Sequence, residues 1–261
     1  MNEERIKEII SGYKSAIIAF SGGVDSTYLA AVAKDVLKER LLLVTATSST
    51  YPFYELTEAK NLAKELNIKH RVIVSEEVDI PGFSDNPPDR CYYCKGELFS
   101  LIKKIADEDG YDAVFEGSNY DDLSDHRPGM KAVKELGIIS PLLEAKLTKK
   151  TIRKFSADRG LPTANKPSFA CLASRFPYGE KITDVKLDRV GKCELHLREL
   201  GFKQFRVRSH GDLARIEFDM DEIENGWRMR NGISEKFKSE GFTFVAIDTD
   251  GYRTGAMNEV L

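Results

Sequence analysis

The feature that most constrains this chain is the run from Ala16 to Ser26, which reads AIIAFSGGVDS. Its apolar first half predicts a buried strand, and the residues after the glycine turn predict a helix. Two glycines let the backbone approach an anion closely. The serine hydroxyls, successive N–H groups and the positive end of the helix dipole can then hold that anion. This strand, turn and helix therefore predict a cradle for a polyphosphate.

The turn differs from the common phosphate-transferring loop, because the chain contains no Gly-x-x-x-x-Gly-Lys-Ser/Thr. A plainer alternative is a tight turn in which Asp25 or Ser26 caps the helix. The run resembles the PP-loop of the ATP pyrophosphatases, which split ATP between its alpha and beta phosphates. The resemblance implies that ATP is bound by Ser21, Gly22, Gly23, Asp25 and Ser26. Asp25 is also the candidate partner of the Mg²⁺ that neutralises the leaving pyrophosphate.

Apolar strands alternate with helical patterns through the first two thirds of the chain, which predicts βαβ units and a parallel sheet. We expect strands near 15–20, 41–46, 70–75 and 112–116, and helices at 25–38, 54–66 and 95–106. Together with the PP-loop, this pattern predicts an α/β fold, an open parallel sheet with flanking helices (adenine nucleotide alpha hydrolase-like), followed by a small α+β domain.

A second segment is expected beside the phosphate cradle. Glu116 to Asn119 leave the carboxyl end of a predicted strand, as the glycine turn does, and open α/β sheets bind ligands at that edge. Ser118, and Arg127 in the loop that follows, are therefore assigned to the ATP site. A salt bridge within the loop is the alternative for Arg127.

The pattern changes in the last third of the chain. A helix at 148–159, with Thr148 as its N-cap and Gly160 as its end, leads into a long loop rich in proline and small residues. Beyond that loop we expect helices at 184–200 and 221–240 and strands at 204–209, 213–218 and 243–248. The predicted domains are 1–178, which carries the ATP and cysteine sites, and 179–261, a small unit for substrate binding or oligomerisation.

Composition restricts the partners and the location. The 39 basic and 42 acidic residues give a formal net charge of −3, so the chain lacks the overall basic field typical of nucleic-acid binding. The first residues, MNEERIKEII, are charged, and no apolar run is long enough to span a bilayer. We expect a cytoplasmic protein with no nucleic-acid or membrane partner, in which the four cysteines form no disulfide framework.

Three of the cysteines need a chemical explanation. Cys91 and Cys94 lie in DRCYYCKGE, at a spacing that brings both sulfurs to one side of a turn, and Cys171 lies in the loop FACLASR. A thiolate from Cys171 would complete a three-cysteine metal site. Cys193 lies in an apolar stripe at helical spacing, so we expect it to be a small buried side chain.

Several kinds of site fit these thiols. A four-iron cluster with three protein ligands leaves one iron open to an external group such as hydrosulfide. Four-coordinate zinc is the main alternative and would recruit Cys193, His126 or His210. A redox dithiol at Cys91 and Cys94, or unreactive thiols, are the remaining interpretations.

Three segments, SGGVDS, GSNYDDLSDHRPGMKA and KPSFACLASRFPYG, resemble the LarE-type sulfurtransferases of the PP-loop superfamily over nearly the whole chain. In that family ATP adenylates a carboxylate of pyridinium-3,5-biscarboxylic acid mononucleotide. Sulfur then displaces AMP to give a thiocarboxylate of the nickel-pincer cofactor of lactate racemase. The resemblance implies a sulfide or other sulfur donor as a partner, and family members often form oligomers, which suggests a homo-oligomer.

The source of the sulfur depends on the cysteines. In single-cysteine family members, the residue that matches Cys171 gives up its own sulfur and becomes dehydroalanine. Cys91 and Cys94 set this chain apart from those members. The resemblance therefore implies the subgroup in which Cys91, Cys94 and Cys171 hold a [4Fe-4S] cluster that delivers a bound sulfide. Cys171 and Asp25 are the two candidate catalytic residues.

Arginines of the second domain are the candidate contacts for a small anionic nucleotide. Arg206 and Arg208 alternate along one predicted strand and so project from the same face, and guanidinium groups suit phosphate and carboxylate. A solvated surface charge is the alternative for each arginine. Glu217 is interpreted as either a metal ligand or an ion-paired carboxylate. The further candidate substrate contacts are Ser174, Arg175, Arg215 and Arg253.

Three other functions share parts of this pattern. Some PP-loop tRNA thiolases also use a Cys-x-x-Cys pair and a third cysteine with an iron–sulfur cluster, although tRNA binding usually needs a basic surface. An amide-forming PP-loop ligase would leave the cysteines unexplained. A nucleotide-binding or iron-sensing regulator would bind the same ligands without catalysis.

Overall fold

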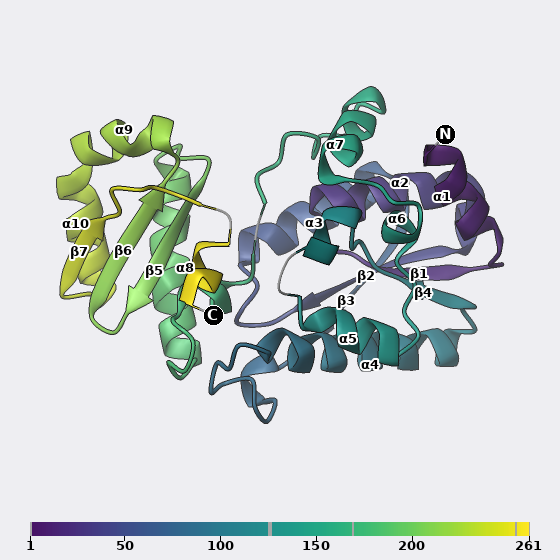
Figure 1. Ribbon diagram of the computed structural model, residues 1–261, viewed down its shortest axis with the longest axis horizontal. Coiled ribbons are helices and arrows are strands. Elements are labelled where there is room, and N and C mark those ends of the chain that lie inside the picture. Colours follow the sequence, from purple (N-terminus) through teal and green to yellow (C-terminus); the bar gives the residue numbers. More distant parts are fainter. Residues whose placement is uncertain (1, 125–126, 169, 254, 261) are drawn as a thin grey trace. The chain divides into compact units, whose positions relative to one another are not determined.

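The computed structural model describes residues 2–124, 127–168, 170–253 and 255–260 (Figure 1). By its internal contacts the chain divides into two units. The first unit comprises Met1–Ile80 and Asp89–Phe169, and the second comprises Pro81–Pro88 and Ala170–Leu261. These contacts assign residues 170–178, and the separate segment 81–88, to the second unit, whereas the sequence boundary was expected after residue 178.

The first unit is built on one parallel sheet, as the alternating pattern predicted. Its strands lie in the order β3-β2-β1-β4, and all three neighbouring pairs are parallel. Because β2 and β4 lie on opposite sides of β1, the chain reverses its direction of travel across the sheet at β1, which is where open α/β sheets bind ligands. The strands are β1 (Ala16–Ala19), β2 (Leu41–Thr47), β3 (Lys69–Val74) and β4 (Ala113–Phe115).

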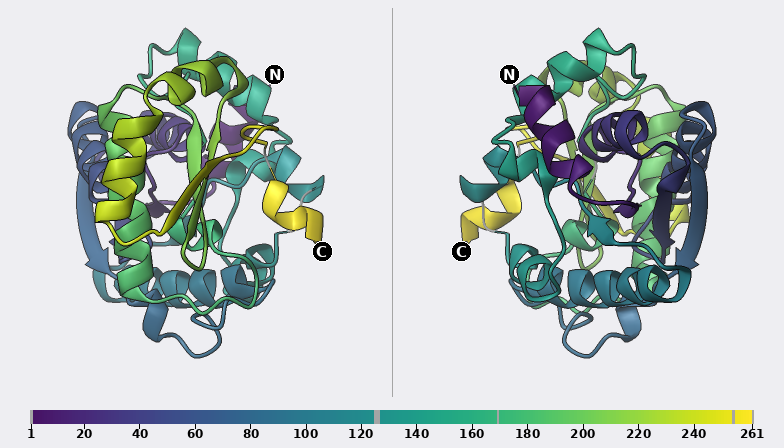
Figure 2. Two further views of the ribbon diagram at one scale, coloured as in Figure 1. Left: turned by 90° about the vertical axis from the view of Figure 1, so that its left-hand side faces the viewer. Right: turned by 90° about the vertical axis from the view of Figure 1, so that its right-hand side faces the viewer.

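Helices cover both faces of this sheet (Figures 1 and 2). One face packs on α1 (Asn2–Ser11), α2 (Val24–Leu37), α3 (Phe53–Glu65), α6 (Pro141–Glu144) and α7 (Lys149–Asp158), and the other packs on α4 (Arg90–Asp109) and α5 (Gly129–Glu135). Ile18 and Leu43 are buried on the α2 side, while Ile17 and Leu42 are buried on the α4 side. Each such side chain contributes about 1.5–3 kcal/mol. Burial on both faces explains the continuous apolar runs.

The second unit contains a three-stranded sheet in the order β5-β6-β7, with β5 and β6 antiparallel and β6 and β7 parallel. Its elements are α8 (Asp184–Glu199), β5 (Phe205–His210), β6 (Leu213–Phe218), α9 (Ile223–Arg228), α10 (Arg230–Ser239) and β7 (Phe244–Ile247). Val207, Ala214 and Ile216 are buried on one face. Arg206 pairs with Glu217 across β5 and β6, and Arg208 pairs with Arg215, so these four side chains share the opposite face.

Two local predictions were wrong. The predicted single helix at 221–240 is two helices that meet at Met229, in a stretch where Asn225–Gly226 and Asn231–Gly232 have low helix propensity. A Cβ on Gly226 would lie 2.5 Å from the Phe218 ring, so packing requires glycine there. The helix expected at 95–106 begins already at Arg90, which places Cys91 and Cys94 within the first five residues of α4.

Segment 81–88 belongs to the second unit, although in the sequence it stands between two stretches of the first unit. The amide of Ile182 donates to the Ser84 carbonyl at 2.8 Å, and the Asn86 amide side chain donates to the Pro177 carbonyl at 2.7 Å. Phe83 is almost fully buried. Among the residues that the structure describes, no helix combines the length and apolar character that a bilayer span requires.

Candidate active site

The glycine turn leads directly from β1 into the first turn of α2. Gly22 adopts φ of 66°, and a Cβ there would lie 3.2 Å from Ala59, so both backbone conformation and space favour glycine. The Ser21 hydroxyl accepts a 3.3 Å hydrogen bond from the Gly23 amide and lies 3.1 Å from the Ser26 hydroxyl. The N-cap residue of α2 is Gly23, which has no side chain to cap the helix, so the first N–H groups of α2 suit an anionic ligand.

The turn and the segment after β4 line one cavity of about 360 Å³ in the first unit. Of the residues assigned to ATP from the sequence, the cavity is lined by Ser21, Gly23, Asp25, Ser26, Ser118 and Arg127. Gly22 shapes the turn without lining the cavity. A Cβ on Gly117 would lie 3.2 Å from the Ser26 amide nitrogen, so the two segments are in close contact.

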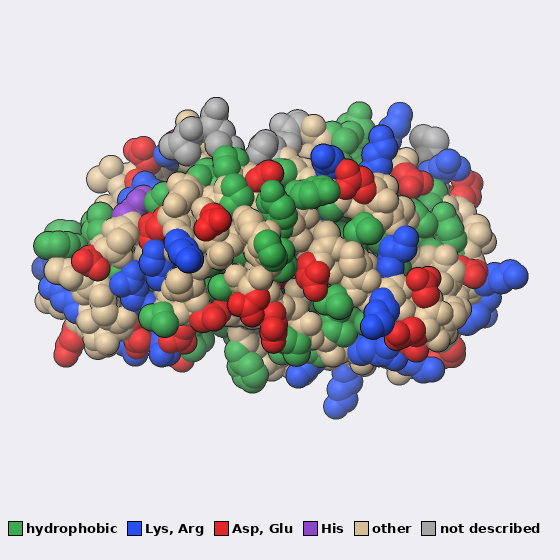
Figure 3. Space-filling model, turned by 90° about the horizontal axis from the view of Figure 1, so that it is seen from below, with side chains coloured by type: hydrophobic (Ala, Val, Ile, Leu, Met, Phe, Trp, Pro, Cys, Tyr) green, Lys and Arg blue, Asp and Glu red, His purple; other side chains and the backbone are tan. Residues whose placement is uncertain are grey.

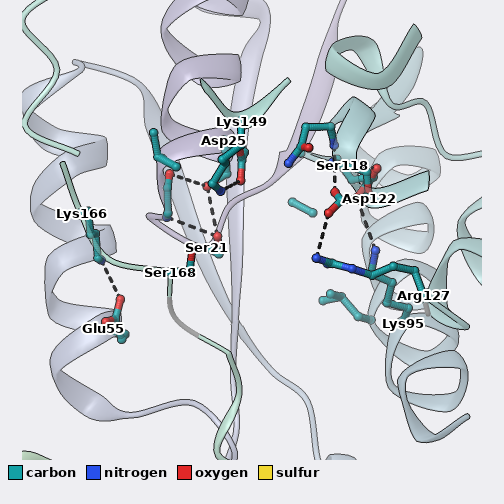
Figure 4. A pocket seen from close by; sticks show the side chains of 18 of the residues that line it. Ser21, Asp25, Glu55, Lys95, Ser118, Asp122, Arg127, Lys149, Lys166 and Ser168 are labelled. Atoms are coloured by element: carbon teal, nitrogen blue, oxygen red, sulfur yellow. Dashed lines mark hydrogen bonds and ion pairs between the residues drawn. The ribbon is translucent and has the colours of Figure 1, made fainter. Parts of the chain in front are cut away.

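Four cations and four carboxylates line this cavity, and they are matched in pairs (Figure 4). Lys149 contacts Asp25, Lys166 lies 2.7 Å from Glu55, Arg127 lies 2.8 Å from Asp122, and Lys95 lies 3.5 Å from Glu116. The pairs neutralise one another within the described cavity. A triphosphate would compete for the cations, and a divalent metal ion would compete for the carboxylates.

Asp25 has one carboxylate oxygen that could bind a metal ion. Its Oδ1 atom is buried and accepts no hydrogen bond from the described part of the chain. Burial raises the pKa of the Asp25 carboxyl, while Lys149 partly offsets that effect. A hard cation such as Mg²⁺ would satisfy this oxygen, so the residues present fit the ion that the PP-loop implies.

Glu116 organises the segment after β4. Its carboxylate accepts hydrogen bonds from the Ser118 amide at 3.0 Å, from the Ser118 hydroxyl at 2.8 Å and from the Ser140 hydroxyl. Ser118 is therefore oriented by Glu116. Its backbone and hydroxyl fix the loop beside the phosphate cradle.

In the second unit, four of the five predicted arginines, Arg175, Arg206, Arg208 and Arg215, form one network with Glu194, Glu217 and Asp248. Arg208 donates to both Glu217 oxygens, at 2.9 and 2.7 Å, and Arg175 donates to both Glu194 oxygens, at 2.7 and 2.9 Å. Glu217 is thus an ion-paired carboxylate among the described residues. Burial opposes ionisation of Glu194, but Arg175 holds the pKa of that carboxyl below its ordinary value.

The remaining arginine candidates differ in their surroundings. Arg206 is buried and stacks on the Tyr252 ring at 4.8 Å, and burial together with Arg175 lowers the pKa of its guanidinium. Arg215 is half-buried and bonds to Asp248 at 2.7 Å. Arg253 is outside this network and pairs with Glu259 at 2.9 Å.

The loop that carries Cys171 is anchored to the arginine network. Arg175 donates to the carbonyls of Ala170 and Cys171, at 2.9 and 3.3 Å, and Arg208 donates to the Ser174 carbonyl at 2.8 Å. The Ser174 hydroxyl donates to the Cys171 carbonyl at 2.9 Å. Fully buried Arg175 therefore holds the backbone of Cys171 in place, beside the face that carries Arg206 and Arg208.

The four cysteines are in different environments. Cys91 is exposed and Cys94 is half-buried, both near the start of α4, and Cys171 is half-buried in the second unit. Cys193 is fully buried, and burial raises the pKa of its thiol to about 12. Among the described residues, no three His, Cys, Asp or Glu side chains are placed to hold one metal ion. His126 lies outside those residues.

Comparison with known proteins places the chain in a family. The NAD synthase family matches residues 3–82. An uncharacterized protein of Synechocystis sp. is 42% identical over 260 residues, which cover 99% of this chain and 97% of that protein. An uncharacterized protein of Methanocaldococcus jannaschii is 31% identical over 241 residues, which cover 92% of each chain. The pyridinium-3,5-bisthiocarboxylic acid mononucleotide synthase of Lactiplantibacillus plantarum is 36% identical over 245 residues, covering 94% of this chain and 89% of that protein.

The chain belongs to the LarE-type sulfurtransferases of the PP-loop superfamily. It is therefore an ATP-dependent sulfurtransferase, and the cavity at the PP-loop is its candidate ATP site.

Sequence reasoning missed three basic residues of this sulfurtransferase's cavity, Lys95, Lys149 and Lys166. Lys149 is the first residue of α7, directly after the N-cap Thr148, whose hydroxyl accepts from the Thr151 amide. The sequence predicted the N-cap of this helix, but it gave no sign that the start of the helix contacts the PP-loop. Lys166 precedes the cysteine loop, and its ammonium group donates to the Gly22 carbonyl at 3.3 Å.

Proposed function

We propose that this sulfurtransferase uses ATP to activate a carboxylate of pyridinium-3,5-biscarboxylic acid mononucleotide and replaces oxygen with sulfur, as a step in nickel-pincer nucleotide biosynthesis. The observation that carries the proposal is the 36% identity, over 94% of the chain, to a synthase of the bisthiocarboxylic acid mononucleotide. The cavity at the PP-loop and the arginine network support the two halves of the reaction.

In the first half, a substrate carboxylate oxygen attacks the alpha phosphorus of ATP. The bond from that phosphorus to the bridging oxygen breaks, and pyrophosphate leaves. Ser21, Ser26 and the first N–H groups of α2 bind the phosphates. The Asp25 carboxylate would hold Mg²⁺, which would supply positive charge to neutralise the leaving pyrophosphate. The ammonium group of Lys149, once released from Asp25, stabilises the negative charge that develops on pyrophosphate.

In the second half, a sulfide nucleophile attacks the acyl carbon of the adenylate, the carbon–oxygen bond to AMP breaks, and a thiocarboxylate forms. Arg206 and Arg208 bind the phosphate or the second carboxylate of the mononucleotide. The arginine network gathers four guanidinium groups in this part of the second unit. Guanidinium groups suit the phosphate and the carboxylates of a small anionic substrate.

The charge distribution on the outer surface also favours a small substrate over a large polyanion. On the face drawn in Figure 3, Lys and Arg side chains occur together with Asp and Glu, and the chain as a whole has a formal net charge of −3. Binding of a large polyanion such as tRNA usually requires one continuous basic surface. This supports a mononucleotide over a tRNA as the substrate.

We place the sulfur-delivering [4Fe-4S] cluster on Cys91, Cys94 and Cys171. The donor set fits, because thiolates are the ligands of such clusters and the pair on α4 lies on one helix face. Cys193 is unsuitable, since its thiol is buried and resists deprotonation. When bound, such a cluster supplies one iron without a protein ligand, to which an external sulfide can attach.

The path of the chain supports the meeting of these three cysteines. Segment 81–88 hydrogen-bonds to the stretch from Pro177 to Ile182. Cys91 follows Pro88 by only three positions, and Cys171 precedes Pro177 by six. Both cysteine segments are therefore tethered by short stretches of chain to the same part of the second unit.

The decisive experiment is an anaerobic assay with ATP, Mg²⁺ and the pyridinium mononucleotide, supplied with sulfide and with reconstituted protein. We expect AMP, pyrophosphate and a product heavier by one sulfur-for-oxygen exchange, with many turnovers per chain. Pyrophosphate release must depend on the mononucleotide. Release without thiocarboxylate would instead indicate a ligase, and no release would indicate a regulator.

The cluster is tested separately by counting iron and sulfide per chain. We expect Cys91→Ser, Cys94→Ser and Cys171→Ser to lose the cluster absorbance, while Cys193→Ala retains it. A protein without iron that turns over once, and whose Cys171 loses the mass of H₂S, would show that the sulfur comes from the side chain of Cys171.

A further inference from the structure

Residues 48–51, which follow β2, contact both the PP-loop and a buried glutamate. The Tyr51 hydroxyl donates a 2.8 Å hydrogen bond to the Ser21 carbonyl, at the entrance of the phosphate cradle. Three residues earlier, the Ser48 hydroxyl donates to the Oε2 atom of Glu77 at 2.7 Å. The buried Thr50 hydroxyl donates to the same oxygen. The short loop therefore connects the nucleotide cradle to Glu77.

Glu77 in turn contacts a cysteine of the Cys-x-x-Cys pair. It lies in the short helix Glu77–Asp79, is only 8% exposed, and its Oε1 atom accepts a hydrogen bond from the Cys94 thiol at 3.4 Å. Its two oxygens thus have different partners, hydroxyls of the loop on one and sulfur on the other. A buried carboxylate held by three donors has little freedom to move independently of them.

All of these residues belong to the first unit, and the loop starts at the carboxyl end of β2, a central strand. The strand fixes one end of the loop. The other end, at Tyr51, lines the candidate ATP cavity and donates to the carbonyl of Ser21, which lines the same cavity. A nucleotide bound in this cavity would compete for the hydrogen bonds of the Ser21 turn. The connected hydrogen bonds give that movement a path to the Cys94 sulfur.

We propose that the loop 48–51 and Glu77 couple occupancy of the ATP cavity to the orientation of the Cys94 thiol, with Glu77 and Tyr51 as positioning residues. The inference rests on the proposed function, in which Cys94 belongs to the sulfur-delivering site. Its consequence is that sulfur is presented for transfer when ATP occupies the cavity, which limits loss of sulfide to water in the absence of an activated substrate.

The test measures alkylation of Cys94 in the full-length, metal-free protein under anaerobic conditions at one fixed pH. The protein is treated with iodoacetamide, with and without saturating Mg²⁺ and α,β-methylene ATP, which cannot be cleaved at the alpha phosphate. Mass spectrometry follows the peptide from Cys91 to Lys95, and its fragments separate the two thiols. Exposed Cys91 is the internal reference.

We expect the analogue to change the alkylation rate of Cys94, relative to that of Cys91, by about fivefold or more. Fivefold is the lower end of the range that is typical of coupling between two sites. In Tyr51→Phe and in Glu77→Gln this response should be lost, although both still bind the analogue at saturation. The control Tyr13→Phe, which removes a hydroxyl from a ring packed on Phe115, should respond as the native protein does.

An unchanged Cys94 rate in the native protein, or a full response in Tyr51→Phe, would overturn the coupling. Two variants at different links keep the test valid if one of them does not fold. The alkylation readout needs neither cluster nor sulfur transfer. Failure of the coupling is therefore separate from failure of the proposed function, which would appear as absence of thiocarboxylate in the turnover assay.

Discussion

The ammonium group of Lys149 contacts the carboxylate of Asp25, which lies 124 positions earlier in the chain. The contact joins the first residue of α7 to the first turn of α2, at the mouth of the PP-loop. Without ligand, the two charges satisfy each other. In the proposed reaction, Asp25 would bind Mg²⁺, and Lys149 would then become available to the phosphates of ATP.

Replacing Lys149 by methionine should lower kcat/KM for ATP by about 10²-fold, because one cation that stabilises the developing charge is lost. The neighbouring lysine, Lys150, is exposed and is the matched control, since Lys150→Met alters the same helix turn without touching Asp25. Pyrophosphate release is the measurement. Equal rates of pyrophosphate release for the two variants would show that Lys149 does not contribute to the reaction.

The variant Asp25→Asn should lose the Mg²⁺ dependence of ATP binding and at least about 10²-fold in the rate of pyrophosphate release. The buried Oδ1 atom then belongs to a neutral amide, which is a weak magnesium ligand. Asp107→Asn, on the exposed side of α4, serves as the control. Titration calorimetry with MgATP at several magnesium concentrations measures the effect, and native-like binding by Asp25→Asn would contradict it.

For Arg206→Met we expect the KM for the mononucleotide to rise about ten- to a hundredfold, which corresponds to loss of one charged hydrogen-bonding partner. The KM for ATP should stay the same. The free energy of unfolding should fall by no more than about 1 kcal/mol, because a buried cation next to Arg175 is removed. Arg228→Met, at an exposed ion pair on α9, is the control for both measurements. A parallel loss of stability would point to a purely structural Arg206.

Cys193 should resist alkylation in the native protein up to about pH 10. Burial raises the pKa of its thiol from 9.0 to about 12, so the reactive thiolate is nearly absent below that range. Mass spectrometry of the metal-free protein should find label on Cys91, Cys94 and Cys171, and on Cys193 only after denaturation. Rapid native labelling of Cys193 at pH 8 would contradict the burial of that residue.

The ion pair between Glu3 and Arg159 should make stability depend on pH in acid. The hydrogen bond from Arg159 holds the pKa of Glu3 at about 2, against an ordinary 4.5. The pair therefore stabilises the folded state above pH 4.5, and this contribution disappears as the pH falls through about 2. Glu3→Gln should cost about 1 kcal/mol at pH 7 in urea unfolding, with the difference from the native protein vanishing near pH 2. A constant difference across pH would exclude the pair as its cause.

The sequence predicted the parallel sheet because its strands are short apolar runs bounded by turns and separated by helices. Ile17 and Ile18 are buried on opposite faces, which is why the first strand reads as continuously apolar. The helix Asn2–Ser11 was not anticipated, since its charged residues hide an apolar stripe that includes Ile6 and Ile10. Such short helices are stabilised mainly by tertiary packing.

The site was predictable where chemistry is local in sequence. Ser21, Asp25 and Ser26 are adjacent in one turn, and Ser118 follows the strand that topology places beside it. Lys149 and Lys166 come from segments whose arrival at the cavity depends on tertiary structure. The pairing of Arg175 with Glu194 was equally hidden, because 19 positions separate them and a lone arginine in a loop gives no sign of its partner.

The return of segment 81–88 to the second unit means that the chain passes between the two units three times. A fragment beginning at Ala170 would lack buried Phe83 and the hydrogen bonds of Ser84 and Asn86, so we expect it to be unstable alone. The two units therefore cannot be exchanged by a single gene fusion. A recombination event that transfers the second unit to another PP-loop domain must also transfer segment 81–88, which precedes the Cys-x-x-Cys pair.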